Sequence, residues 1–243
     1  MTAIKLKGLK KSFGKKVAVN GIDLEVAEGE LFGLLGVNGA GKTTTIRMLS
    51  CLSRPSGGEA WVNGHSILTE ADLVKSSIAV SPQETSVAPN LTVRENLEFM
   101  AEVYGYGRSE AKEKADKIIK EYSLGEVEQR RAKLLSGGWQ RRLSIAMAMI
   151  SDPCVLFLDE PTLGLDVLAR RELWQTIEGM KGKRTVILTT HYLEEAEALC
   201  DRIAIMVDGD VKAVGTAAEL KALTSTNSLE EAFIKIAQRG DVK

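Results

Sequence analysis

The sequence predicts an α/β fold with a phosphate-binding loop, an antiparallel N-terminal β layer and an inserted helical segment. The loop Gly36–Thr43 lies between an apolar run and a helical pattern, the strand–loop–helix setting typical of phosphate-binding cores. Strand-like stretches come early in the chain, and strands alternate with helices later. Between Leu91 and Ile150 only helical patterns occur, which predicts a helical insertion in the core.

The first elements expected are strands, one of which leads directly into the glycine-rich loop. They are Ile4–Leu9, Ile22–Val26, Leu31–Leu35 and Glu59–Val62. The run Leu31–Leu35 contains no polar side chain, which indicates a strand buried on both faces. We therefore expect a buried strand that enters the loop, in an α/β core with a β-rich N-terminal layer.

The loop matches G-x-x-x-x-G-K-(Ser/Thr), in which backbone N–H groups surround the phosphates of a nucleotide. Lys42 is expected against the β and γ phosphates and the Thr43 hydroxyl on magnesium. The following helix, Thr44–Leu52, would point its positive N-terminus at the phosphates. A glycine-rich turn without a ligand is the alternative, and the flanking strand and helix disfavour it. The nucleotide-binding residues expected here are Gly36, Asn38, Gly39, Ala40, Gly41, Lys42, Thr43 and Thr44.

A second set of small residues precedes a helix in the middle of the chain. The segments expected there are the strand Ser77–Val80 and the helices Thr92–Tyr104, Glu110–Tyr122 and Trp139–Ile150. The sequence Ser136-Gly-Gly138 before the last helix exposes N–H groups at a helix N-terminus, which makes a second anion site. We interpret the charged run Ser109–Lys120 as a solvated helix face, and Met147 and Met149 as core residues.

Paired carboxylates end the apolar run Val155–Leu158. Successive strand residues point to opposite faces, so Asp159 and Glu160 are expected to have different roles. One can hold the magnesium shell while the other faces the γ-phosphate and a water molecule. A strand is also expected at Thr185–Thr190, followed by His191, which by itself would be an ordinary polar residue at a strand end.

In this order and spacing, these motifs resemble the nucleotide-binding subunit of ATP-binding-cassette (ABC) transporters, a P-loop NTPase family, from about Ile4 to about Gly215. The resemblance assigns Lys42 and Thr43 to the Walker A motif. It makes Asp159 the magnesium-side aspartate and Glu160 the general base that orients the attacking water. ATP and magnesium are the implied cofactors.

The resemblance also assigns residues that would carry little weight alone. Gln83 corresponds to the glutamine-loop residue that reaches magnesium and the lytic water, and His191 to the switch histidine that contacts the γ-phosphate. Asp166 corresponds to the D-loop aspartate, whose partner lies in the facing subunit. Phe13 lies where the family places an aromatic ring on the adenine, although it could instead anchor a short turn. The catalytic set is thus Glu160, His191, Gln83 and Lys42, and the metal set is Thr43, Gln83 and Asp159.

Two positions depart from the family pattern. The signature commonly reads Leu-Ser-Gly-Gly-Gln, whereas Trp139 takes the fifth position here, and Val37 stands where many relatives have proline. Ser136, Gly137 and Gly138 are present, and in the family the signature holds the γ-phosphate from across a dimer. We expect little consequence from Val37, because that position contributes only backbone shape.

A single ABC ATPase domain is expected over residues 1–243. Its RecA-like core with the β layer would span 1–86 and 151–215, the helical subdomain 87–150 and a short helical tail 216–243. Helices are expected at Ala217–Leu223 and Leu229–Ala237, and the charged run Glu194–Glu197 is interpreted as a solvated helix face. The tail resembles that of single-domain subunits of drug, antibiotic and polysaccharide exporters.

Composition limits the class of protein. The chain has 32 Lys plus Arg against 33 Asp plus Glu, so no net basic field attracts nucleic acid. Three scattered cysteines without metal spacing suggest a reducing cytoplasm. No apolar run approaches the roughly 18 residues that span a bilayer, and the N-terminus lacks a secretion signal. A membrane role therefore requires another polypeptide.

The sequence thus predicts an ATP-binding and ATP-hydrolysing subunit at the inner face of the cell membrane, powering transport, and more specifically export. Its expected partners are an integral membrane permease and a second copy of the chain, packed head to tail around ATP, with no nucleic acid. The alternatives are a soluble ABC ATPase acting on nucleic acid or ribosomes, and a small-molecule kinase or noncatalytic regulator. The transported substrate lies outside what this sequence determines.

Overall fold

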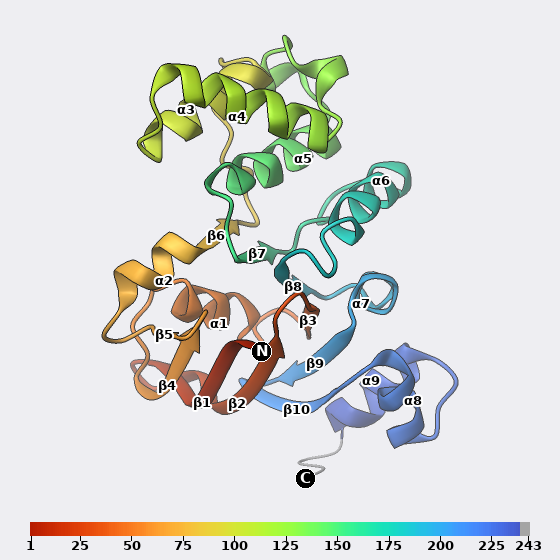
Figure 1. Cartoon of the computed structure of the whole chain (residues 1–243). Helices are drawn as coiled ribbons and strands as arrows, with labels where there is room; N and C mark the ends of the chain where they lie inside the picture. Colours follow the sequence, from red (N-terminus) through yellow and green to blue (C-terminus); the bar gives the residue numbers. More distant parts are fainter. Residues whose placement is uncertain (239–243) are drawn as a thin grey trace.

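The computed structural model describes residues 1–238, which form two β-sheets and a helical part (Figure 1). The strands are β1 (Thr2–Phe13), β2 (Lys16–Ala27), β3 (Leu31–Leu35), β4 (Gly57–Val62), β5 (His65–Ser66), β6 (Ile78–Ser81), β7 (Val155–Asp159), β8 (Thr185–Thr190), β9 (Arg202–Val207) and β10 (Asp210–Gly215). One sheet has the order β2-β1-β4-β5 and the other β10-β9-β3-β8-β7-β6.

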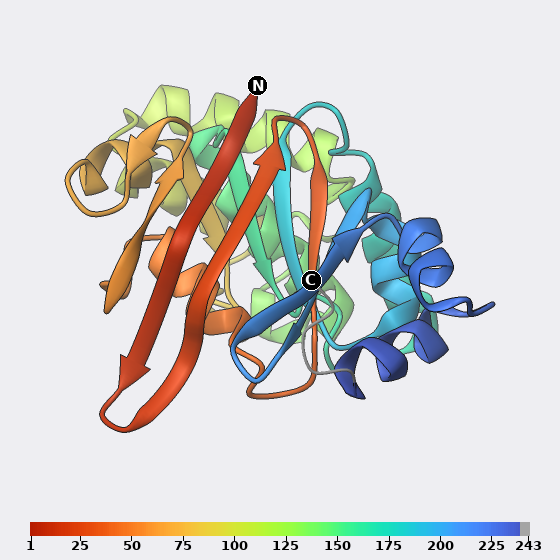
Figure 2. The ribbon, with the colours of Figure 1, turned by 90° about the horizontal axis from the view of Figure 1, so that it is seen from below.

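The four-stranded sheet is antiparallel, as expected for the N-terminal layer. Burial alternates along β2, where Ile22, Leu24 and Val26 face inward between exposed residues. Figure 2 shows β1 and β2 in front of the strands of the other sheet. Helix α1 (Lys42–Leu49) contributes Ile46 to a buried cluster that also contains Phe157 of β7, so α1 packs between the two sheets.

The six-stranded sheet brings distant parts of the chain to one edge. Strands β3, β8, β7 and β6 are parallel neighbours in that order, so their carboxyl ends meet at the same edge. The glycine-rich loop follows β3, His191 follows β8, Glu160 follows β7 and Gln83 lies just beyond β6. A site can form at this edge, because a candidate site residue follows each of the four strands there.

The remaining helices cover the sheet and build the inserted segment. They are α2 (Ala71–Ser77), α3 (Val93–Val103), α4 (Arg108–Glu121), α5 (Gly137–Ala148), α6 (Val167–Glu178), α7 (Leu193–Leu199), α8 (Ala217–Thr224) and α9 (Leu229–Gln238), with short 3-10 turns at Gly125–Val127, Ala132–Leu134 and Met149–Ser151. Helices α3, α4 and α5 lie together at one end of the molecule (Figure 1). Thr92 and Glu95 form a capping box that starts α3.

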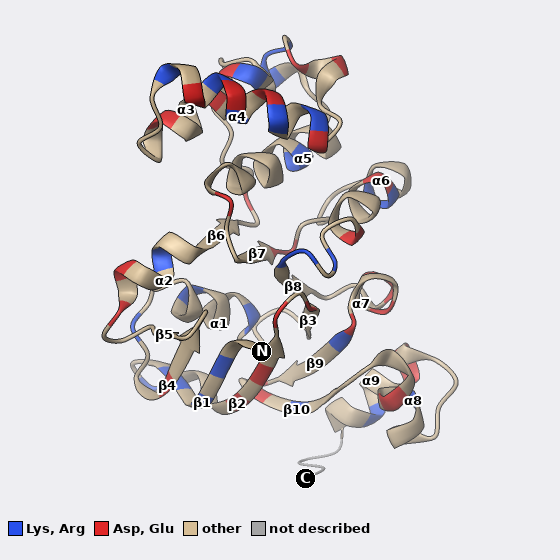
Figure 3. Cartoon of the chain, in the orientation of Figure 1, with Lys and Arg blue, Asp and Glu red and all other residues tan. Residues whose placement is uncertain are grey.

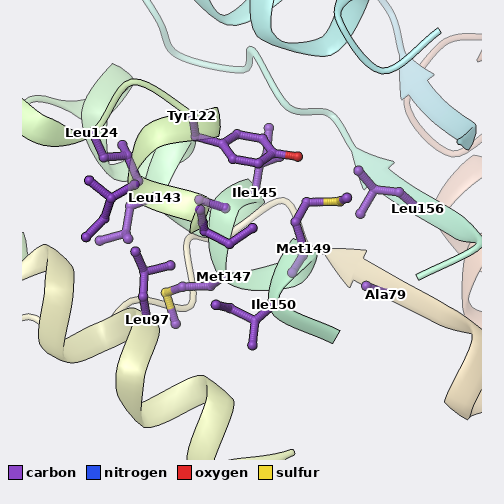
Figure 4. Close-up of a cluster of buried hydrophobic side chains, with 14 of the residues drawn as sticks. Ala79, Leu97, Tyr122, Leu124, Leu143, Ile145, Met147, Met149, Ile150 and Leu156 are labelled. Atoms are coloured by element: carbon purple, nitrogen blue, oxygen red, sulfur yellow. The ribbon is translucent and has the colours of Figure 1, made fainter. Parts of the chain in front are cut away.

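The inserted helices have their own apolar core. Leu97 of α3, Leu143 of α5 and Leu124 are fully buried, and Met147 and Met149 pack beside them (Figure 4). The prediction that these methionines are core residues is confirmed. Acidic and basic residues alternate along α4 on the outside of this core, which fits the predicted solvated face (Figure 3).

Some sequence expectations need correction. Helices α2 and α6 had no counterpart among the expected helices, whereas α7 lies where the charged run Glu194–Glu197 predicts a helix face. That run is not a uniformly solvated face: Glu195 is fully buried, and its Oε1 accepts a hydrogen bond from Trp174 Nε1 at 3.1 Å. The helix after the loop begins at Lys42, two residues earlier than expected. The last residues of the expected tail, 239–243, lie outside the described residues.

Candidate functional site

The glycine-rich loop wraps around the lysine that follows it. Gly41 has φ +105°, and a Cβ there would lie 2.5 Å from the Ala18 carbonyl oxygen, so this position requires glycine. Lys42 opens α1 and is nearly buried. Its Nζ donates to the Gly36 carbonyl oxygen at 2.7 Å and to that of Val37 at 3.3 Å. The ammonium group is therefore held inside the loop, where a phosphate would lie.

Asp159 ends β7 with its carboxylate turned toward hydroxyl groups. Its Oδ1 accepts hydrogen bonds from Thr43 Oγ1 at 3.0 Å and from Thr189 Oγ1 at 2.5 Å. Carboxylate and hydroxyl oxygens are the hard ligands that Mg²⁺ prefers, and Mg²⁺ on a nucleotide needs few protein ligands because phosphates and waters supply the rest. The pair Thr43 and Asp159 thus has the chemistry of a magnesium site. Within residues 1–238 no cluster of three or more His, Cys, Asp and Glu residues could hold a metal.

Glu160 faces the lysine and the histidine instead. Its Oε1 lies 3.4 Å from Lys42 Nζ, and its Oε2 lies 2.7 Å from His191 Nδ1. Its backbone has φ +46°, a left-handed conformation that costs a residue with a side chain about 1 to 2 kcal/mol. Glu160 N donates to Thr189 Oγ1 at 3.0 Å, which helps to hold this turn. The two neighbouring carboxylates therefore have different partners, as alternation along the strand predicts.

A hollow of about 550 Å³ lies over the loop, a volume in the range of small-ligand sites. It is lined by Phe13, Lys16, Ala18, Asn38, Gly39, Ala40, Gly41, Lys42, Thr43, Thr44, Gln83, Glu160, Leu163 and His191. Most residues expected to bind the nucleotide thus meet here, whereas Gly36 and Asp159 lie outside the lining. Phe13 is 56% exposed at the turn between β1 and β2, and Lys11 Nζ lies 4.9 Å from the centroid of its ring.

Three lining residues were absent from the expected set. Lys16 follows the Phe13 turn, Ala18 lies beside Gly41, and Leu163 lies four residues beyond Asp159. Only Lys16 had a sequence signal, a lysine close to the expected aromatic contact. Ala18 and Leu163 are ordinary residues whose place depends on how β2 and the loop after β7 fold over the site.

The signature residues lie around a different hollow of about 250 Å³. It is lined by Ser136, Gly138, Trp139, Arg142, Asp166, Leu168, Ala169, Glu172 and Leu173. Ser136 caps the N-terminus of α5, and Asp166 caps α6 by accepting from Leu168 N and Ala169 N at 2.9 and 3.0 Å. The two hollows share no lining residue. Within one chain, Ser136, Gly138 and Asp166 are therefore not part of the phosphate-loop site.

The residues at the signature pack closely. Gly138 approaches α6 so nearly that a Cβ there would lie 2.8 Å from Ala169 Cβ. Gly137 begins α5, and its Cβ would meet Leu165 at 3.5 Å. Trp139, which departs from the family pattern, has its ring 4.6 Å from the Arg142 guanidinium carbon, a cation–π contact. It therefore helps to shape the wall of this second hollow.

Sequence comparison places residues 19–163 in the family described as ABC transporter. The chain is 46% identical over 228 residues to the daunorubicin/doxorubicin resistance ATP-binding protein DrrA of Streptomyces peucetius, covering 93% of this chain and 69% of that protein. It is 43% identical over 215 residues to the Nod factor export ATP-binding protein I of Rhizobium sp. (strain N33), covering 88% and 71%.

Solved structures show the same fold. The chain superposes on an ATP-binding subunit of an ABC transporter with a TM-score of 0.84 and 28% identity, covering 97% of this chain and all of the other. A dimeric ATP-binding cassette in a post-hydrolysis state, bound to ADP and Pi, matches with a TM-score of 0.77 and 26% identity over 88% of this chain and 98% of that one. In the part of the chain that the structure describes, no helix is long and apolar enough to cross a bilayer. The fold and the family match agree with the ordered motifs, and the chain belongs to the ABC transporter family.

Proposed function

We propose that this chain binds and hydrolyses ATP at the phosphate-loop hollow and uses the cycle to drive export through a separate membrane protein. One observation carries the proposal. The Glu160 carboxylate lies 3.4 Å from Lys42 Nζ and 2.7 Å from His191 Nδ1, at the edge where the glycine-rich loop and the ends of the parallel strands meet. This geometry supports Glu160 as the general base, Lys42 as the phosphate-binding cation and His191 as the switch residue around one γ-phosphate.

In this mechanism the loop N–H groups and Lys42 bind the β and γ phosphates. Glu160 accepts a proton from the attacking water, and His191 contacts the γ-phosphate beside it. Thr43, Asp159 and Gln83 would hold magnesium, which stabilises the charge on the transferred phosphoryl group when bound. The Phe13 ring stacks on the adenine, because it is exposed at the rim of the same hollow.

The second hollow supports a dimer in which each site uses two chains. Ser136, Gly137, Gly138 and Asp166 lie at helix N-termini away from the phosphate loop of their own chain. A second copy packed head to tail would bring its signature to the γ-phosphate, and two-fold symmetry would make both sites equivalent. The dimeric relative with ADP and Pi supports this arrangement.

Transport and its direction are inferred from relatives. DrrA is named for drug resistance and the Nod factor protein for export, which favours export over the alternative role on nucleic acid or ribosomes. The chain would work with a membrane permease at the cytoplasmic face. In this proposal residues 1–86 and 151–215 form the ATP-binding core with its β layer, 87–150 the helical subdomain and 216–243 the tail.

Phosphate release from ATP and magnesium, without any acceptor, tests the proposed hydrolysis. We expect Glu160→Gln to keep ATP binding and to slow phosphate release by about 10²-fold or more, because the amide keeps the shape but cannot accept the proton. Glu59→Gln, which changes an exposed glutamate on β4, serves as the matched control. Near-normal turnover in folded Glu160→Gln protein would rule out this assignment. If the wild-type chain formed ADP only when a phosphate acceptor was added, the chain would be a kinase.

A further inference from the structure

A buried arginine on the signature helix joins the segments that carry Gln83 and Glu160. Arg141 lies on α5, five residues after the cap Ser136, and is only 4% exposed. Every one of its hydrogen bonds goes to a backbone carbonyl oxygen rather than to a carboxylate. Its side chain is therefore a connector between chain segments and not one half of an ion pair.

The first group of acceptors lies in the glutamine loop beyond β6. Arg141 Nη1 donates to the Pro82 carbonyl oxygen at 2.5 Å and to the Gln83 carbonyl oxygen at 3.0 Å. One turn further along α5, Ser144 Oγ lies 3.2 Å from Ser81 Oγ, which ties the same helix face to the end of β6. Two independent contacts thus hold the start of the glutamine loop against α5.

The second group of acceptors follows β7. Arg141 Nη2 donates to the carbonyl oxygens of Asp159 and Glu160 at 2.8 and 2.9 Å, and Nε donates to that of Pro161 at 2.7 Å. These hydrogen bonds hold the backbone in place before and after Glu160, whose own φ is left-handed. The turn aims the Glu160 carboxylate at Lys42 and His191, so its anchoring bears on the geometry of the reaction.

Only arginine satisfies this set of acceptors. The guanidinium group offers five N–H donors in a planar fork, and five carbonyl acceptors surround it here. Lysine keeps the charge but has one nitrogen and a different geometry. Burial lowers the pKa of Arg141 to about 10, while the negative charge of Asp159 opposes that shift, so the guanidinium remains cationic near neutral pH.

We propose that Arg141 is a positioning residue that sets Gln83 and the Glu160 carboxylate relative to the signature helix. It does not line the phosphate-loop hollow and acts through the backbone of both residues. The proposal rests on the proposed ATP hydrolysis. It adds that α5, whose N-terminus would serve the partner's ATP, is mechanically tied to the catalytic segments of its own chain.

Steady-state phosphate release by the full chain tests this role with two variants. Arg141→Lys keeps the charge and loses the fork, and Arg141→Met keeps an apolar stem and loses every donor. We expect kcat to fall by about tenfold or more in Arg141→Lys, with the Kd for ATP within about threefold of the wild type. A small displacement of catalytic groups lowers the rate of the chemical step strongly and changes ATP affinity little. Arg94→Lys is the control: Arg94 bonds to Glu98, Asp116 and Glu128 in the helical part. The kcat of Arg94→Lys should stay within about twofold of the wild-type value.

A double-mutant cycle with Gln83→Ala separates positioning from general damage. If Arg141 acts through Gln83, combining Arg141→Lys with Gln83→Ala should cost less than the product of the two single losses. A folded Arg141→Lys variant with kcat within about twofold of wild type would overturn the proposal. So would strictly multiplicative losses, or a lowered ATP affinity with unchanged kcat. If Arg141→Met does not fold, Arg141→Lys decides the question. Normal turnover in Glu160→Gln would identify failure of the proposed function itself, and the role of Arg141 would fall with it.

Discussion

The separation of the two hollows predicts that inactive variants can restore each other. Lys42→Ala removes the ammonium from the phosphate loop, and Ser136→Arg places a large cation at the cap of α5. Each variant alone should be nearly inactive, because every composite site in its homodimer has lost one half. In a mixed dimer both changes fall at one site, and the other site keeps Lys42 from one chain and Ser136 from its partner.

The size of the recovery follows from this geometry. The hollows share no lining residue, so a change at one is not expected to distort the other within the same chain. If equal amounts of the two variants exchange at random, about half of the dimers are mixed, and each mixed dimer has one intact site of two. Turnover should therefore recover to about one quarter of the wild-type value per chain.

The assay is phosphate release after mixing, with exchange followed independently. Two differently tagged variants should copurify when ATP and magnesium are present. A mixture of Lys42→Ala with Glu160→Gln is the matched control, because both changes lie in the phosphate-loop hollow and no pairing rebuilds an intact site. That mixture should remain inactive although its chains exchange equally well.

Proven exchange with no recovered phosphate release would refute independent composite sites. Strict cooperativity between the two sites gives the same result, so a linked dimer carrying both changes at one composite site is required. If that linked dimer is also inactive, the two sites hydrolyse ATP only when both are intact. If it is active while the mixture is not, the dimer does not form as proposed.

Three further predictions concern single residues. Phe13→Ala should weaken ATP binding by about 0.5 to 1.5 kcal/mol in calorimetry with unchanged melting temperature, because the ring is exposed; unchanged affinity would favour the packing role. Gly41→Ala should abolish ATP binding in a filter assay, since its Cβ would lie 2.5 Å from the Ala18 carbonyl oxygen; wild-type affinity would contradict the required loop shape. Burial raises the pKa of Glu195, so the folded chain keeps a proton that the unfolded chain has released. The free energy of unfolding should therefore fall as pH rises above about 4.5, and denaturant titrations should show a smaller fall in Glu195→Gln.

Much of the site could be predicted because its chemistry is local in the chain. A glycine-rich loop followed by Lys42 and Thr43 predicts anion binding, because the backbone N–H groups of a few consecutive residues form the binding surface. The paired carboxylates and the strands before them follow from apolar runs of typical strand length. Short-range patterns of this kind predicted strand β3 at its observed bounds, and alternation along β7 predicted that Asp159 and Glu160 differ in their surroundings.

Other features depend on contacts that sequence patterns do not encode. Glu195 lies in a charged run typical of a solvated face, yet the approach of α6 buries it against Trp174. Arg141 follows the signature as one of two adjacent arginines, and nothing local distinguishes it from Arg142. Burial decides the difference: Arg141 points into the sheet edge, whereas Arg142 contacts Trp139 and Glu172 near the surface.

By itself, the sequence determined the phosphate loop, the Asp-Glu strand end, the signature and the helical insertion, because each consists of residues that are neighbours along the chain. Only the tertiary structure decided which of them meet. The strand order β3-β8-β7-β6 differs from the order in the chain, and it brings Lys42, Glu160 and His191 to one edge while Ser136 lies at another hollow. The physical reason is that parallel pairing and packing of buried apolar surfaces, not proximity along the chain, set the distance between functional groups.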